Sequence, residues 1–488
     1  IKMRTKLLII VTAFLIISNG CFSERKSEKK PNILFILVDD LGWADLGYTG
    51  STFYETPNVD KLAGSGMVFT DAYAASPVCS PSRAAIMTGK YPARLNLTDY
   101  IPGNRHYGPH KNQKLASHPF NLQLDLEEYT IAEAFKNAGY NTFFAGKWHL
   151  GEEEKYYPNH QGFDINKGGN STGYPAGGYF APYKNPQLED GKKGEYLTDR
   201  LTEETINFIK NNKGQPFFAY LSFYTVHLPL QKKKKKVEKY RNKLSEMNYS
   251  GREFIKKGDT YHKQWQNMLH YAAMVESMDE NVGRVLKFLR KENLDENTII
   301  VFTSDNGGMA TSNRTDNIST TNLPLRAGKG YLYEGGIRVP LIVRWPKKVK
   351  AGGITDYPTT ATDLYPTLLD LAEIELKESQ HPDGVSLKSV LKKDKMKERP
   401  VFWHYPHYSG GLGGKPSGAV RLGDYKLIEF FENNRIELYN LNEDINETTD
   451  LAEAKPEKVK ELKRLLHQWR KGVGAQMPFP NPHYSEEE

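Results

Sequence analysis

The chain has 488 residues, of which 38% are hydrophobic and 26% are charged, and its formal net charge is +7. It contains no low-complexity block and no apolar run of about 18 residues, which excludes fibrous, disordered and multi-span membrane proteins. The positive charge is local, because residues 1–30 hold seven basic and two acidic residues and Lys232–Lys236 adds five lysines. The rest of the chain is slightly acidic, which argues against nucleic acid as a partner.

The N-terminal segment has the order of a secretory signal peptide. Basic residues precede the apolar stretch Leu7–Ile17, and small and polar residues then lead to Cys21. We predict a signal peptide at 1–20 and a linker at 21–30. A cysteine directly after a small residue resembles a bacterial lipobox, so an acyl chain on Cys21 would be the only membrane contact, with simple cleavage as the alternative. In both cases we expect an exported protein, in the periplasm or as a lipoprotein of the outer membrane or cell surface.

The following part of the chain alternates between buried strands and helices. Ile33–Val38 is a continuous apolar run, which is typical of a parallel strand covered on both faces. Helical spacing at 130–138 ends at Gly139, and apolar residues recur at helical spacing from Ala272 to Leu289. This pattern indicates an α/β fold with a mostly parallel central sheet in a first domain of residues 31–351, with further strands predicted at 141–145, 217–224 and 298–303.

From about Gly352 the pattern changes, and we predict a smaller C-terminal α+β subdomain of residues 352–488. It should contain a helix at 363–371 and a loop rich in Gly and Pro at 409–418. An amphipathic terminal helix is expected to dock this subdomain onto the first domain, and an antiparallel hairpin is predicted from two strands at 421–431 and 435–441.

Polar side chains follow the carboxyl ends of the predicted parallel strands, where ligands bind in open sheets. The first strand leads into Asp39-Asp40, and the strand at 298–303 leads into Asp305-Asn306. These side chains offer only oxygen ligands, so their convergence would favour Ca²⁺, and less strongly Mg²⁺, over Zn²⁺. Taken singly, such pairs are more often N-caps and turn formers. The two other strands lead into basic side chains, namely Lys147, His149 and His227.

A short motif gives the sequence its most specific signal. Cys79-Ser80-Pro81-Ser82-Arg83 resembles the signature of the type I sulfatases, in which a maturation enzyme oxidises the cysteine to formylglycine. The resemblance covers nearly the whole chain, in the family's order: Asp39-Asp40, Gly146–Gly151, His227, Ser304–Gly307, Gly328–Gly330 and Glu334–Arg338. It implies an alkaline phosphatase-like fold and a sulfatase of the kind that bacteria export to degrade sulfated polysaccharides.

The resemblance also implies a role for each matching residue. The metal ligands would be Asp39, Asp40, Asp305, Asn306 and the modified Cys79, and the sulfate would be surrounded by Arg83, Lys147 and Lys329. One hydroxyl of the hydrated aldehyde would attack sulfur, and the other would then expel sulfate. His149 fits the base and His227 the acid that protonates the departing sugar oxygen, although which histidine does which stays open. As single residues, such histidines and lysines are more often structural or surface groups.

The substrate is predicted to be a sulfated polysaccharide or oligosaccharide, such as ulvan, carrageenan or a glycosaminoglycan. His404 and His407 precede the Gly-rich loop and suit contact with a sugar, with packing as an equal alternative, and Arg105 is a weaker candidate. Lys232–Lys236 is expected to be a solvated run, with binding of anionic polymer as the alternative. The rival functions are a phosphonate or phosphate ester hydrolase of the same fold and an inactive glycan-binding surface lipoprotein.

Overall fold

The structure is a computed structural model that describes residues 29–103 and 108–485. The predicted signal peptide, Cys21 and Arg105 therefore lie outside the described residues. In the described ranges, no helix combines the length and the apolar character that crossing a membrane requires.

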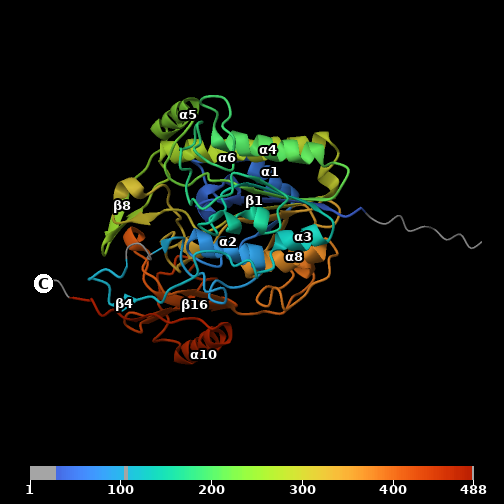
Figure 1. The fold of residues 1–488 in the computed structure, drawn as a ribbon. Helices are drawn as coiled ribbons and strands as arrows, with labels where there is room; N and C mark the ends of the chain where they lie inside the picture. Colours follow the sequence, from blue (N-terminus) through green and yellow to red (C-terminus); the bar gives the residue numbers. More distant parts are fainter. Residues whose placement is uncertain (1–28, 104–107, 486–488) are drawn as a thin grey trace, which may run out of the picture.

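An eight-stranded sheet forms the centre of the molecule (Figure 1). Its strands lie side by side in the order β13 (Gly353–Thr355), β2 (Met67–Phe69), β12 (Leu341–Arg344), β10 (Thr298–Ser304), β1 (Asn32–Val38), β7 (Phe217–Ser222), β5 (Asn141–Gly146) and β6 (Ile165–Lys167). The strands from β10 to β6 are all parallel, whereas β12 is antiparallel to both of its neighbours. The predicted α/β class with a mostly parallel sheet is confirmed.

Helices cover both faces of this sheet (Figure 1). Leu34 and Ile36 of β1 lie in one core, and Ile33 and Phe35 lie in the other, which explains the continuous apolar run. The first core is shared with α1 (Pro57–Ser65), α4 (Leu197–Asn211), α5 (Lys234–Ser245) and α6 (Leu269–Lys291). The second core is shared with α2 (Cys79–Thr88), α3 (Ile131–Asn137), α8 (Leu364–Leu371) and α9 (Lys388–Leu391).

The C-terminal part adds an antiparallel sheet, with strands in the order β15 (Val401–Tyr405), β16 (Ser417–Leu422), β17 (Tyr425–Phe430) and β18 (Ile436–Asn440). The predicted hairpin forms between β17 and β18. The strand expected at 421–431 is interrupted, however, because Gly423 makes a turn with φ +58° between β16 and β17. Glycine adopts this conformation without the penalty that a side chain would cause.

The terminal helix α10 (Pro456–Val473) packs mainly on the C-terminal sheet, and it also contacts the main body, where the centroid of the Trp469 ring lies 5.1 Å from that of the Tyr91 ring. Leu462 and Leu466 of α10 pack with Phe402 on the outer face of the sheet. On the inner face, Trp403 packs against Tyr73 of the main body. Figure 1 accordingly shows β16 between α10 and the main body. Both faces of the C-terminal sheet are apolar, so its inner face packs directly on the main body while its outer face packs against α10.

The remaining elements are short and border the main layers. β13 and α8, which follow residue 352, pack with the main body. A three-stranded sheet is formed by β8 (Phe254–Lys257), β9 (Thr260–Lys263) and β11 (Thr311–Ser312). The others are β3 (Ala72–Tyr73) with β14 (Thr359–Thr360), β4 (Leu115–Ala116) with β19 (Phe479–Pro480), and the single-turn helix α7 (Glu334–Ile337).

Candidate active site

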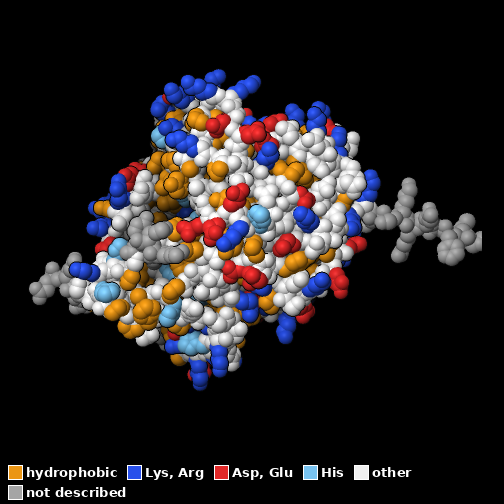
Figure 2. All heavy atoms as spheres, viewed as in Figure 1, with side chains coloured by type: hydrophobic (Ala, Val, Ile, Leu, Met, Phe, Trp, Pro, Cys, Tyr) orange, Lys and Arg blue, Asp and Glu red, His pale blue; other side chains and the backbone are white. Residues whose placement is uncertain are grey.

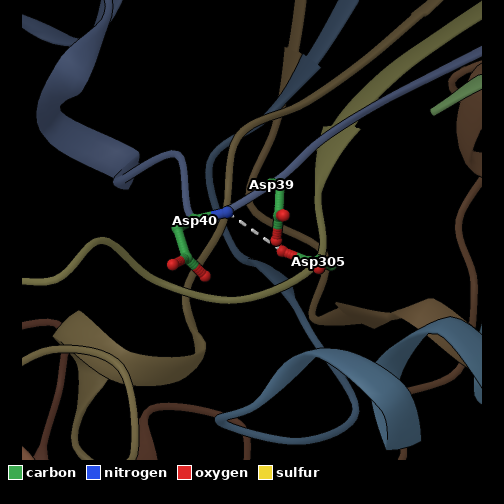
Figure 3. A group of neighbouring side chains, drawn as sticks. All are labelled: Asp39, Asp40 and Asp305. Atoms are coloured by element: carbon green, nitrogen blue, oxygen red, sulfur yellow. Dashed lines mark hydrogen bonds between the residues drawn. The ribbon is translucent and has the colours of Figure 1, made fainter. Parts of the chain in front are cut away.

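Two neighbouring parallel strands bring four oxygen-bearing side chains together. Asp39 and Asp40 follow β1, and Asp305 and Asn306 follow β10, which is its direct neighbour. Carboxylate oxygens of the three aspartates lie within 4.8 Å of one another. In Figure 3, Asp39 and Asp305 point toward each other, and the Asp40 backbone N–H donates a hydrogen bond of 3.2 Å to Asp305. All four residues are buried.

This cluster fits a hard divalent cation. The Asn306 amide nitrogen donates to Asp40 Oδ1 at 2.8 Å, while the amide oxygen is buried and accepts no hydrogen bond from any described residue. Burial and the carboxylates of Asp305 and Asp40 raise the pKa of Asp39, because the cluster resists a further negative charge. A cation would relieve this repulsion, and three carboxylates with one amide oxygen are ligands for Ca²⁺ or Mg²⁺.

Three cations surround the carboxylates. The Lys147 ammonium lies 2.8 Å from Asp39 Oδ2, and Arg83 Nε donates to Asp305 Oδ2 at 2.9 Å. Both cations are buried behind the aspartates and do not line the adjacent cleft. Lys329, 2.7 Å from Asp40 Oδ1, does line that cleft. Burial alone would raise the pKa of Asp40, but the nearby positive groups, of which Lys329 contributes most, together outweigh it and hold this pKa well below its usual range.

Cys79 is the first residue of α2 and lies in a cleft of about 740 Å³. The partial positive charge of a helix N-terminus favours anions at this position. Pro81 fits in the first turn of α2, because residues of this turn do not use their backbone N–H groups in helical hydrogen bonds. The Ser82 hydroxyl accepts a hydrogen bond from the backbone N–H of Ser76 and donates one to the Ser76 carbonyl. Burial raises the pKa of the Cys79 thiol. The unmodified side chain is therefore a neutral thiol, a poor nucleophile.

Both predicted histidines line this cleft. His149 Nε2 lies 2.6 Å from the Ile101 carbonyl and donates to it, which leaves Nδ1 as an acceptor that is buried and without a described partner. His227 Nδ1 donates to the Leu228 carbonyl at 2.8 Å, and its Nε2 lies 3.7 Å from Asp40. Burial lowers the pKa of His227 to about 3 and that of His149 well below its usual value, so both rings are neutral.

The two C-terminal histidines lie outside the cleft. His404 is buried and donates to the Gln476 carbonyl at 2.9 Å. His407 lies 2.8 Å from the Thr98 hydroxyl and its ring contacts Tyr405. The sequence interpretation missed Tyr100, Ser171–Tyr174 and Met309 of the cleft wall. It did point to Tyr405, which stands beside the two histidines in the sequence, and to the Gly-rich loop, of which Ser409–Leu412 line the cleft.

The comparisons with known proteins agree with this geometry. The sulfatase family model matches residues 31–374, and one for the C-terminal part of N-sulphoglucosamine sulphohydrolase matches residues 327–472. A sulfatase of Formosa agariphila is 32% identical over 89% of this chain and 86% of its own. The N-acetylgalactosamine-6-sulfatase of Mus musculus is 31% identical over 86% of this chain and 75% of its own. The crystal structure of Ps i-CgsB with k-i-k-neocarrahexaose matches with a TM-score of 0.73 and 33% identity, covering 91% of this chain and 93% of that one.

Proposed function

The chain belongs to the sulfatase family and is a sulfuric ester hydrolase, and we propose that it removes sulfate from a carbohydrate by means of a formylglycine formed from Cys79. The observation that carries this proposal is the position of Cys79 at the N-terminus of α2, in one cleft with Lys329, His149 and His227. The carbohydrate class is supported by the relatives, which include an N-acetylgalactosamine-6-sulfatase and a structure that holds a neocarrahexaose.

Each side chain of the site would have a separate task. Hydrated formylglycine would supply a hydroxyl nucleophile for sulfur, and a Ca²⁺ held by Asp39, Asp40, Asp305 and Asn306 would supply positive charge beside it. Lys329 offers a fixed cation to the sulfate oxygens at the cleft surface. Lys147 and Arg83 orient Asp39 and Asp305 from behind.

The histidines would move protons. The free Nδ1 of His149 is suited to accept a proton, because its Nε2 is occupied by the Ile101 carbonyl. His227 is the group left to protonate the departing sugar oxygen. Because its ring is neutral with the proton on Nδ1, its Nε2 would first have to take up a proton, which the nearby carboxylate of Asp40 favours. His407 would act indirectly, by supporting the ring of Tyr405 in the cleft wall.

The chemistry is tested on protein produced together with a formylglycine-generating maturation enzyme. Mass spectrometry of the Cys79 peptide should show loss of the thiol, and active protein that keeps the thiol would disprove the mechanism. Chelation should abolish turnover and Ca²⁺ should restore it better than Mg²⁺, because the ligands are all oxygen. Full turnover without metal would instead make the aspartates a structural cluster.

The substrate class is tested with a panel of sulfated oligosaccharides from carrageenan, ulvan and glycosaminoglycans, with release of sulfate as the measurement. The rival phosphonate or phosphate ester hydrolase is tested with matched aryl sulfate and aryl phosphonate, and faster phosphonate turnover would favour it. Export and acylation of Cys21 belong to the same proposal, which is supported by the order of basic, apolar and small residues before Cys21. Mass spectrometry of the mature N-terminus would distinguish an acylated from a simply cleaved protein.

A further inference from the structure

We propose that a second cavity beside the catalytic cleft binds another anionic group of the substrate, on a sugar near the one that loses its sulfate. This rests on the proposed action on sulfated carbohydrates. Met309 lines the cleft that contains Cys79, whereas the next two residues, Ala310 and Thr311, line the second cavity, which has a volume of about 330 Å³. One stretch of backbone thus contributes to the walls of both cavities.

Arg326 is the fixed cation of this second cavity. Its guanidinium carbon lies 3.8 Å from the ring centroid of Tyr333, and its Nη1 donates to the Tyr439 hydroxyl at 2.9 Å and the Glu447 carbonyl at 2.7 Å. Nε and Nη2 form the other edge of the group and have no hydrogen bond to residues 29–103 or 108–485. That edge presents two parallel donors, the geometry that binds a sulfate or a carboxylate.

The other charges of the cavity leave it positive. Lys257 at the end of β8 is exposed and has no ion pair with a described residue. Figure 2 shows basic and acidic side chains side by side at the edge of the molecule where Figure 1 places β8. Lys263 is already paired with Glu253. The carboxylate of Glu447 also lines the cavity, but it accepts from the Lys426 ammonium at 2.9 Å and from the Glu334 N–H at 2.7 Å. Lys257 and Arg326 are therefore the cations available to an anion.

The hairpin of β8 and β9 supplies a matched control. Lys256 and Lys257 are neighbours on β8 and both are exposed, but successive side chains of a strand point to opposite faces. The Lys256 ammonium lies 5.8 Å from the ring centroid of Tyr261, and Lys256 lines neither cavity. Replacement of either lysine removes the same charge from the same hairpin, and only Lys257→Gln removes it from the cavity.

The test measures binding to protein that retains the Cys79 thiol, which cannot turn the ligand over. Isothermal titration calorimetry would compare oligosaccharides of one backbone that carry a single sulfate, two sulfates, or one sulfate and one carboxylate. For the unchanged protein and Lys256→Gln, the second anionic group should improve affinity at least about tenfold, as expected for hydrogen bonds to a charged group. For Lys257→Gln most of this gain should disappear, and Arg326→Gln should remove the rest.

The outcomes separate the two proposals. No gain from a second anionic group, or an equal loss in Lys256→Gln and Lys257→Gln, would overturn the second cavity as a binding site while the carbohydrate substrate stands. A gain from sulfate but not from carboxylate, or the reverse, would identify the anion. If no oligosaccharide binds the unchanged protein while the matured enzyme hydrolyses an aryl sulfate, the carbohydrate substrate itself is wrong, and with it the role of this cavity.

Discussion

Two regions of the molecule bury clusters of charge, and they differ in how completely the buried polar groups around these charges are hydrogen-bonded. Beneath the C-terminal sheet, the Lys426 ammonium is fully buried between Glu334 at 2.8 Å and Glu447 at 2.9 Å. Glu334 also accepts from Arg338 Nε at 2.6 Å. At the strand ends, by contrast, the Asn306 amide oxygen and His149 Nδ1 are buried without a described partner.

The difference indicates which charges serve the fold and which serve the reaction. A closed network satisfies every buried group and holds two parts of the chain together, whereas removal of one partner leaves an uncompensated charge. An incomplete network beside a cleft has free donors and acceptors that a ligand must satisfy. Substitutions in the two regions should therefore affect different measurements.

The largest effect is expected for Cys79→Ala. Without a precursor of formylglycine the nucleophile is absent, and loss of a nucleophile in such a site lowers turnover by roughly 10⁴-fold or more. The melting temperature should stay nearly constant, because a small side chain is replaced by one only slightly smaller. Sulfate release and thermal denaturation of the matured protein check both parts. Turnover close to that of the unchanged enzyme would contradict the assignment.

In the closed network, Lys426→Met should reduce the free energy of unfolding by about 3–5 kcal/mol, because two buried glutamates lose their shared cation. Denaturant titration measures this loss. The control is Lys458→Met, since Lys458 pairs with Glu461 at the surface and such pairs contribute less than about 1 kcal/mol. Similar losses in both variants would show that the Lys426 network is no more important than a surface pair.

Gly173→Ala should disturb catalysis without disturbing the fold. A Cβ atom at this position would lie 2.5 Å from His149 Cε1, so the imidazole must move. A displacement of about 1 Å at a catalytic group can cost about 100-fold, and we expect kcat/KM to fall by about 10- to 100-fold. Gly472→Ala in α10 is the control, because its Cβ would meet nothing within 4 Å. Gly472→Ala should keep full activity. An unchanged kcat/KM in Gly173→Ala would contradict a role for His149 in proton transfer.

The smallest effect is expected for His407→Ala. The His407 ring contacts Tyr405 in the cleft wall, so its loss should reduce kcat/KM on the natural glycan by about tenfold and change turnover of a small aryl sulfate little. His404→Ala should change neither rate, because His404 lies on the side of the sheet that faces α10. Equal losses of kcat/KM on both substrates would instead indicate that His407 supports the fold or the binding of the sulfate group.

The sequence by itself determined the class of fold and the chemistry of the strand ends. Continuous apolar runs such as Ile33–Val38 identified central strands, because strands buried on both faces leave this pattern. The side chains that follow them converge in space since the carboxyl ends of neighbouring parallel strands meet at one edge. Asp39, Asp305 and Cys79 could thus be predicted from local sequence and a resemblance.

Only the tertiary structure decided which face each C-terminal side chain occupies. All five residues of β15 are buried, so no alternation of polar and apolar residues indicates its orientation. In the structure Trp403 and Tyr405 face the main body, and Phe402 and His404 face the other side. The same ambiguity affected α10, whose apolar stripe fits any apolar surface. The packing of two apolar faces, which depends on residues far apart in the chain, made Tyr405 rather than His404 part of the cleft.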